Sequence, residues 1–162
     1  MNYFELFGFG ISPVIDPSLV TKRYIALQRE AHPDFYTQEL REDQESAMNR
    51  SAEINKAYKT FKDPDETLAY FLKQCSVLKE GEKFELSPDF LMEMMEINEM
   101  LTDDPEKGGA AAKEFQQSLN EDIKMKIRSW EDDRENSELL NDLKSLYFRK
   151  KYLNRILDRL GD

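Results

Sequence analysis

The tripeptide His32-Pro33-Asp34 combines residue types that could do chemistry, and it contains the only histidine of the chain. Apolar residues at helical spacing precede and follow it. Proline cannot continue a helix and disfavours helical geometry in the preceding residue, so the sequence predicts a sharp corner here. An imidazole and a carboxylate at such a corner could act as a general base with its orienting group, or could form a binding motif.

The catalytic interpretation of His32 and Asp34 is the weaker of the two. No nucleophile, phosphate-binding loop or second histidine accompanies them. We therefore expect no catalytic residue, no cofactor and a protein that is not an enzyme. The only cysteine, Cys75, excludes an intramolecular disulfide. One cysteine and one histidine also argue against a zinc or iron–sulfur site within this chain, so no metal is expected.

Composition indicates a helical globular protein that does not bind nucleic acid or a membrane. The chain has 162 residues, of which 40% are hydrophobic and 35% charged, and its net charge is −10. Nucleic acids and anionic membranes require a basic surface, which this balance does not favour. No apolar run is long enough to span a bilayer, and the N-terminus lacks the features of a targeting segment. We expect a cytoplasmic protein.

The periodicity of apolar residues predicts an all-α fold with two parts. Residues 1–75 should form a helical hairpin, in which helices of about 17–31 and 42–61 meet at the corner and short helices flank them. Asp16 and Pro17 suit the N-cap and first position of the first long helix. Its expected buried stripe is Val20, Tyr24, Leu27 and Ala31. Residues 76–86 should be a linker.

Residues 87–162 should form a three-helix bundle. Its first helix is expected from Pro88 to about Leu101, opened by Ser87. Asp103-Asp104-Pro105 and the pair Gly108-Gly109 are expected to break the helical pattern before the second helix. Ser137 should cap the last helix and Gly161 should end it. The expected core stripe of that helix is Leu139, Leu143, Leu146, Leu153, Leu157 and Leu160.

The first bundle helix has more apolar residues than its core requires. When it is projected at about 100° per residue, one narrow stripe suffices for packing. That stripe consists of Phe90, Met94, Ile97 and Leu101. Leu91 and Met95 lie well off it, and Met92 lies on the far side beside Glu99. On the last helix, Phe148 and Tyr152 similarly project away from the core stripe. These residues are ordinary apolar surface, or they pack on the hairpin, or they bind a partner.

The hairpin carries a basic face ahead of the corner. Lys22 and Arg29 lie two helical turns apart and share the face opposite Tyr24 and Leu27, and Arg23 flanks them. Such a face could simply be solvated, or it could dock on an acidic partner surface. In an acidic chain we favour docking, which would act mainly on orientation and association rate.

Several motifs together give this chain a family resemblance. The tripeptide between two helices resembles the signature of J-domains, which stimulate ATP hydrolysis by DnaK-type chaperones. One departure is Phe35, where HscB-like and many other J-domains have a basic residue. Further segments resemble the HscB branch, the J-type co-chaperones of iron–sulfur cluster assembly. They are Tyr3-Phe4-Glu5-Leu6-Phe7-Gly8, Leu27-Gln28-Arg29, Ser51-Ala52-Glu53-Ile54-Asn55-Lys56-Ala57-Tyr58, and Phe90-Leu91-Met92-Glu93-Met94-Met95-Glu96-Ile97-Asn98-Glu99.

The resemblance implies two binding surfaces. A DnaK/HscA-type ATPase chaperone would contact the J-domain through His32, Pro33, Asp34, Lys22, Arg23 and Arg29. An IscU-type iron–sulfur scaffold would bind the bundle through Leu91, Met92, Met95, Glu96, Glu99, Tyr152 and Phe148. Two alternatives remain open, namely a J-domain co-chaperone with a different client and a helical scaffolding protein whose corner is incidental.

Overall fold

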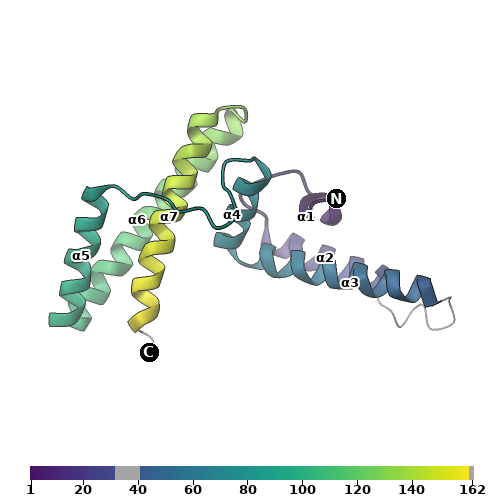
Figure 1. Ribbon diagram of the computed structural model, residues 1–162, viewed down its shortest axis with the longest axis horizontal. Helices are drawn as coiled ribbons and strands as arrows, with labels where there is room; N and C mark the ends of the chain where they lie inside the picture. The colour runs from purple at the N-terminus through teal and green to yellow at the C-terminus, as the bar shows by residue number, and fades with distance from the viewer. Residues whose placement is uncertain (32–40, 161–162) are drawn as a thin grey trace. The chain divides into compact units, whose positions relative to one another are not determined.

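The computed structural model describes residues 1–31 and 41–160, and it is all-α as predicted (Figure 1). Every regular element in these two ranges is an α-helix. The predicted corner at His32-Pro33-Asp34, the neighbouring Phe35 and the predicted C-terminal cap Gly161 lie outside the described residues. The chain divides into two compact units, Met1–Gln74 and Cys75–Asp162.

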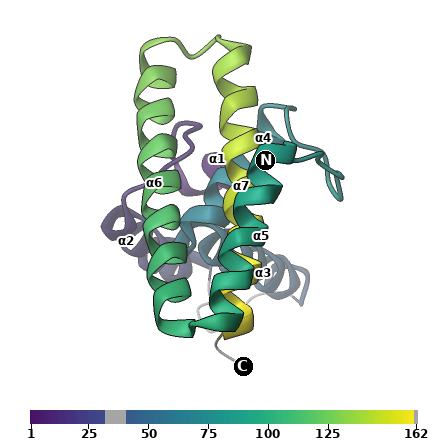
Figure 2. The same ribbon diagram turned by 90° about the vertical axis from the view of Figure 1, so that its left-hand side faces the viewer.

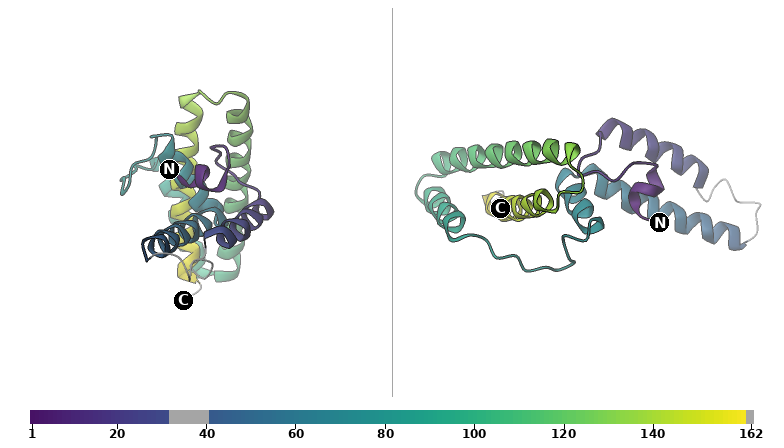
Figure 3. Two further views of the ribbon diagram at one scale, coloured as in Figure 1. Left: turned by 90° about the vertical axis from the view of Figure 1, so that its right-hand side faces the viewer. Right: turned by 90° about the horizontal axis from the view of Figure 1, so that it is seen from above.

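The first unit is built on a pair of long helices. Its elements are α1 (Tyr3–Phe7), α2 (Pro17–Ala31), α3 (Arg41–Lys62) and α4 (Pro64–Gln74). Helices α2 and α3 lie side by side (Figures 1 and 3). Asp16 caps α2 as predicted, because its carboxylate accepts the Ser18 N–H at 2.9 Å. In the expected stripe, Val20 and Ala31 are buried, whereas Tyr24 and Leu27 are half-buried.

An aromatic cluster holds α1 against α3 and α4. Phe4 is fully buried, and its ring lies 5.3 Å from that of Phe61 and 5.4 Å from that of Tyr70. The Tyr70 hydroxyl accepts the backbone N–H of Tyr3 at 2.8 Å, and burial raises the pKa of Tyr70. Stacked and edge-on ring pairs stabilise a fold beyond the burial of their apolar area. Helix α1 is too short to be stable alone, so this packing holds it in place.

The second unit is a bundle of three helices, α5 (Pro88–Asp103), α6 (Pro105–Asp132) and α7 (Ser137–Leu160) (Figure 2). The Ser87 hydroxyl accepts the Phe90 N–H at 3.2 Å, so Ser87 caps α5 as expected. Asp104 caps α6 by accepting the Lys107 N–H at 3.2 Å. The bundle core contains Phe90, Met94, Ile97, Leu101, Ala112, Leu119, Ile123, Ile127, Trp130, Leu143, Leu146, Leu153 and Ile156.

Two expectations for the helix boundaries were wrong. Helix α6 begins at Pro105 and continues through Gly108 and Gly109, because a strong cap at Asp104 and a proline in the first turn start the helix before them. Helix α7 is capped by Asn136 rather than Ser137. The Asn136 side-chain oxygen accepts the N–H groups of the second and third helical residues at 3.0 and 3.3 Å.

The buried stripe of α7 also differs in part from the prediction. Leu143, Leu146 and Leu153 are buried as expected. Leu139 and Leu157 are only half-buried, and the side chain of Leu160 lies outside the described residues. Ile156, which the prediction omitted, is buried in their place.

Candidate functional site

The predicted basic face lies on the solvent side of α2. Lys22, Arg23 and Arg29 are all exposed. The opposite side of α2 packs on α3, where the ring of Tyr24 stacks on that of Tyr58 with centroids 4.0 Å apart. This contact sets which side of α2 faces the solvent. The three cations are therefore presented by a helix whose inner side is held in place.

A hydrogen-bond network between α2 and α3 sets the register of the two helices. The Gln28 amide donates to the Ser51 carbonyl at 3.2 Å and to the Asn55 side-chain oxygen at 3.0 Å. In return, the Ser51 hydroxyl donates to the Gln28 side-chain oxygen at 2.8 Å, and the Tyr24 hydroxyl donates to Asn55 at 2.8 Å. The sequence had indicated these positions only as motif residues, and the structure gives their roles in positioning the basic face.

The predicted apolar face of α5 is exposed. The side chains of Met92 and Met95 are 60% and 62% accessible, and Leu91 is half-buried. Glu96 and Glu99, which lie on the same side of the helix, are exposed as well. Flexible, polarisable methionine side chains suit irregular partner surfaces. Within this unit the helix thus exposes a surface that is apolar in the middle and acidic at its rim.

Tyr152 lies where α7 meets α5. The Tyr152 ring contacts the Phe90 ring edge-on, with centroids 6.0 Å apart. The guanidinium of Arg149 lies 5.4 Å from the centroid of the Phe90 ring. Phe90 is a core residue at 2% exposure, so the half-buried Tyr152 extends the core to the surface rather than pointing away from it. Because Leu91 follows Phe90 in sequence, this contact brings Tyr152 near the start of the exposed face of α5.

Phe148 is not open to solvent in the way that its projection suggested. The ring of Phe84 stacks on it with centroids 4.7 Å apart and an interplanar angle of 2°. Phe84 belongs to residues 76–86, which have no regular secondary structure and which we call the strap. Sequence reasoning missed this contact because the strap has no periodicity, and the only signal was an aromatic residue among charged ones.

Lys144 of α7 holds the strap at a second place. Its ammonium forms an ion pair with Glu82, donates to the Val77 carbonyl at 3.0 Å and lies 5.9 Å from the Phe84 ring centroid. The side chains of Lys144 and Glu82 are only 17% and 18% exposed. The hydrogen bond from Lys144 is the main cause that lowers the pKa of Glu82. The strap is therefore part of the second unit.

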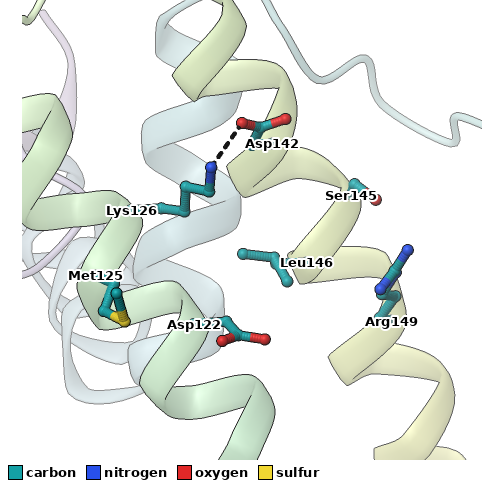
Figure 4. Close-up of a pocket in the computed structure, with 7 residues that line it drawn as sticks. All are labelled: Asp122, Met125, Lys126, Asp142, Ser145, Leu146 and Arg149. Atoms are coloured by element: carbon teal, nitrogen blue, oxygen red, sulfur yellow. Dashed lines mark hydrogen bonds and ion pairs between the residues drawn. The ribbon is translucent and has the colours of Figure 1, made fainter.

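A second surface feature lies between α6 and α7, where side chains line an open groove of about 290 Å³ (Figure 4). Lys126 and Asp142 span it with an ion pair of 2.9 Å, and Met125 is 62% exposed at its edge. The sequence did not indicate this groove. In the part of the chain that the structure describes, no group of three histidine, cysteine, aspartate or glutamate side chains could hold a metal ion.

Comparison with known proteins bears on these surfaces. Residues 86–161 match a sequence model described as the HSCB C-terminal oligomerisation domain. The chain is 35% identical over 171 residues to the co-chaperone protein HscB homolog of Colwellia psychrerythraea, in an alignment that covers 100% of this chain and 97% of that relative. The chain belongs to the HscB family. Its first unit is accordingly the J-domain, and its second unit is the C-terminal helical domain.

Solved HscB structures share the fold. The crystal structure of human co-chaperone protein HscB superposes with a TM-score of 0.76 at 28% identity, covering 99% of this chain and 81% of the human one. The chaperone HscB from Vibrio cholerae gives a TM-score of 0.60 at 30% identity, covering 99% of each chain. Among the residues described for this HscB-family chain, no helix is both long and apolar enough to cross a membrane.

Proposed function

We propose that this protein is a co-chaperone that links a DnaK/HscA-type ATPase chaperone to an IscU-type iron–sulfur scaffold. One observation supports the proposal most strongly. The two most exposed apolar side chains of α5, Met92 and Met95, lie in the region that matches the HscB C-terminal sequence model, and carboxylates surround them. Adjacent exposed apolar side chains rimmed by charged ones are typical of protein-binding sites.

In the proposed mechanism, the J-domain supplies the chaperone-binding surface. Lys22, Arg23 and Arg29 would orient the domain on an acidic surface of the chaperone, and the His32-Pro33-Asp34 corner would stimulate ATP hydrolysis. Exposed cations act mainly on encounter and orientation, so their removal should slow association more than it speeds dissociation. None of these groups would transfer a proton or form a bond, so the protein would have no catalytic step of its own.

The bundle would hold the scaffold through the α5 face and the neighbouring rings of α7. The residues proposed are Leu91, Met92, Met95, Glu96, Glu99, Phe148 and Tyr152. Since one chain would carry both surfaces, the scaffold would reach the chaperone at a raised effective concentration. The chaperone would then hydrolyse ATP while the scaffold is bound, and this coupling would favour transfer of the cluster from the scaffold to an acceptor.

The scaffold end is tested by calorimetric titration with the IscU-type scaffold. Each truncation in a Leu91→Ala/Met95→Ala/Tyr152→Ala variant should weaken binding by about 1–3 kcal/mol, and the triple variant should show no measurable binding. Met125→Ala is the matched control, because Met125 is as exposed as Met95 but lies on α6. If the native chain fails to bind the scaffold, a J-domain co-chaperone with a different client becomes the better hypothesis.

The chaperone end is tested by the steady-state ATPase rate of the chaperone. We expect His32→Gln to abolish stimulation, and Lys22→Gln/Arg29→Gln to raise the concentration required for half-maximal stimulation. The control Arg50→Gln/Lys59→Gln removes the same two charges from exposed positions of α3. Stimulation that is unchanged by His32→Gln would favour a scaffolding protein with an incidental corner.

A further inference from the structure

Side chains of the strap and α7 line an open pocket of about 360 Å³, which adjoins the proposed scaffold-binding face of α5. Its apolar part is formed by Phe84, Leu86, Phe148 and Tyr152. Two of these side chains, Phe148 and Tyr152, also belong to the proposed scaffold site. The other two come from the strap, which the sequence predicted to be only a linker.

The apolar part of the pocket is held in a fixed shape. The rings of Phe84 and Phe148 are parallel and half-buried, and the ring of Tyr152 is held by its edge-on contact with Phe90. Lys144 also fixes the strap near Phe84 through its contacts with Glu82 and Val77. A preformed aromatic surface costs little ordering entropy when a ligand binds, which favours its use as a binding site.

Three cations stand around this aromatic surface. Lys83, Lys151 and Arg155 line the pocket and are exposed, although the chain as a whole has a net charge of −10. The only carboxylate in the lining, Glu82, is paired with Lys144 and also accepts the Lys79 N–H at 3.2 Å. The charge of Glu82 is thus offset within the protein, and the rim of the pocket remains basic.

We infer that this pocket is a second part of the scaffold-binding surface, and that it takes an apolar side chain of the scaffold that stands beside a carboxylate. The inference rests on the proposed function. An aromatic floor accepts an apolar group, and a basic rim selects a neighbouring anion. The face of α5 has an acidic rim at Glu96 and Glu99, so a partner that contacts both places meets opposite charges at its two ends, which fixes its orientation.

Calorimetric titration with the IscU-type scaffold tests the inference, using a Lys83→Gln/Lys151→Gln/Arg155→Gln variant at two salt concentrations. The matched control Lys107→Gln/Lys113→Gln/Arg128→Gln removes two lysines and one arginine from exposed positions of α6. We expect the pocket variant to bind roughly tenfold more weakly at low salt, with a smaller loss at high salt, because salt screens exposed charges. The control should bind within about twofold of the native chain at both salt concentrations.

A scan of aspartate and glutamate substitutions in the scaffold should then identify the carboxylate. Its loss should have little further effect in the pocket variant, because the interaction is already absent there. If the native chain binds and the pocket variant binds equally well, the inference is overturned and the proposed function stands. If pocket and control variants lose the same affinity, net charge is the cause and the inference is again overturned. No binding by the native chain overturns both.

Discussion

The two adjacent glycines of α6 should respond to alanine in opposite ways. A Cβ atom on Gly108 would lie 2.5 Å from the Leu101 nitrogen, 2.6 Å from the Leu101 Cα and 2.8 Å from the Met100 carbonyl carbon. These are backbone atoms of α5, and they cannot rotate aside as a side chain can. A Cβ atom on Gly109 would meet nothing within 4 Å. Gly108→Ala therefore forces α5 and α6 apart, whereas Gly109→Ala fits.

The expected magnitudes follow from two opposing terms. Replacing glycine by alanine in a helix interior stabilises by about 1 kcal/mol, which is the full expected effect of Gly109→Ala. Gly108→Ala gains the same amount, but overpacking against an immobile neighbour costs roughly 3 kcal/mol, at the upper end of the usual range, so the net loss is about 2 kcal/mol. The two variants should thus differ by about 3 kcal/mol in the free energy of unfolding.

Urea unfolding followed by the fluorescence of Trp130 measures this difference. Trp130 is the only tryptophan of the chain and is 5% exposed in α6, so its signal reports on the bundle. Gly109→Ala should raise the midpoint and Gly108→Ala should lower it, with the slope unchanged. Equal midpoints for the two variants would refute the close approach of α5 and α6 and, with it, the placement of the exposed face of α5.

Three further predictions concern the contacts that position the surfaces. Gln28→Ala removes the two hydrogen bonds between Gln28 and Ser51 and the one that Gln28 donates to Asn55. It should lower the free energy of unfolding of the J-domain by about 1 kcal/mol, measured by circular dichroism. Because the folded-state pKa of Glu82 lies below its ordinary value of 4.5, its pair with Lys144 stabilises the native state above that pH and is lost as the pH falls further. The stability difference between the native chain and Glu82→Gln should accordingly be present at pH 7 and vanish under strongly acidic conditions, and a constant difference would contradict the assignment. Phe84→Ala removes one of two stacked rings and should speed amide exchange in the strap while leaving that of the α6 core unchanged.

The fold was predictable where local rules and packing agree. Asp16 and Ser87 cap their helices as the sequence indicated, because an N-cap depends only on the next three residues. The exposure of Met92 and Met95 followed from the helical projection alone, since the core stripe of α5 was narrow and continuous. These features depend on residues close in sequence, and sequence patterns describe such relations well.

The failures fall into two kinds. The cap of α7 at Asn136 rather than Ser137 was a local choice between two neighbouring residues that can both cap a helix. The others arise from contacts between different elements of the fold. Gly108 was interpreted as a helix breaker, but it is glycine because α5 approaches too closely for a side chain, a fact that no local pattern contains. The stack of Phe84 on Phe148 likewise joins a segment without periodicity to a helix far along the chain. Gln28, Ser51 and Asn55 were visible in the sequence only as motif residues, and the hydrogen bonds between them were not.

These nonlocal contacts bear directly on the proposed binding surfaces. Pairing of two copies through the exposed Met92 and Met95 would bring the carboxylates of Glu96 and Glu99 together, and like charges would oppose it. The same carboxylates would also repel an acidic partner, so an attractive region elsewhere on the bundle would be required to bind one. The strap creates such a region by placing Phe84 on α7 among cations. A segment that merely joined two domains would require neither the aromatic stack nor the ion pair of Lys144, and their presence argues that the strap takes part in binding.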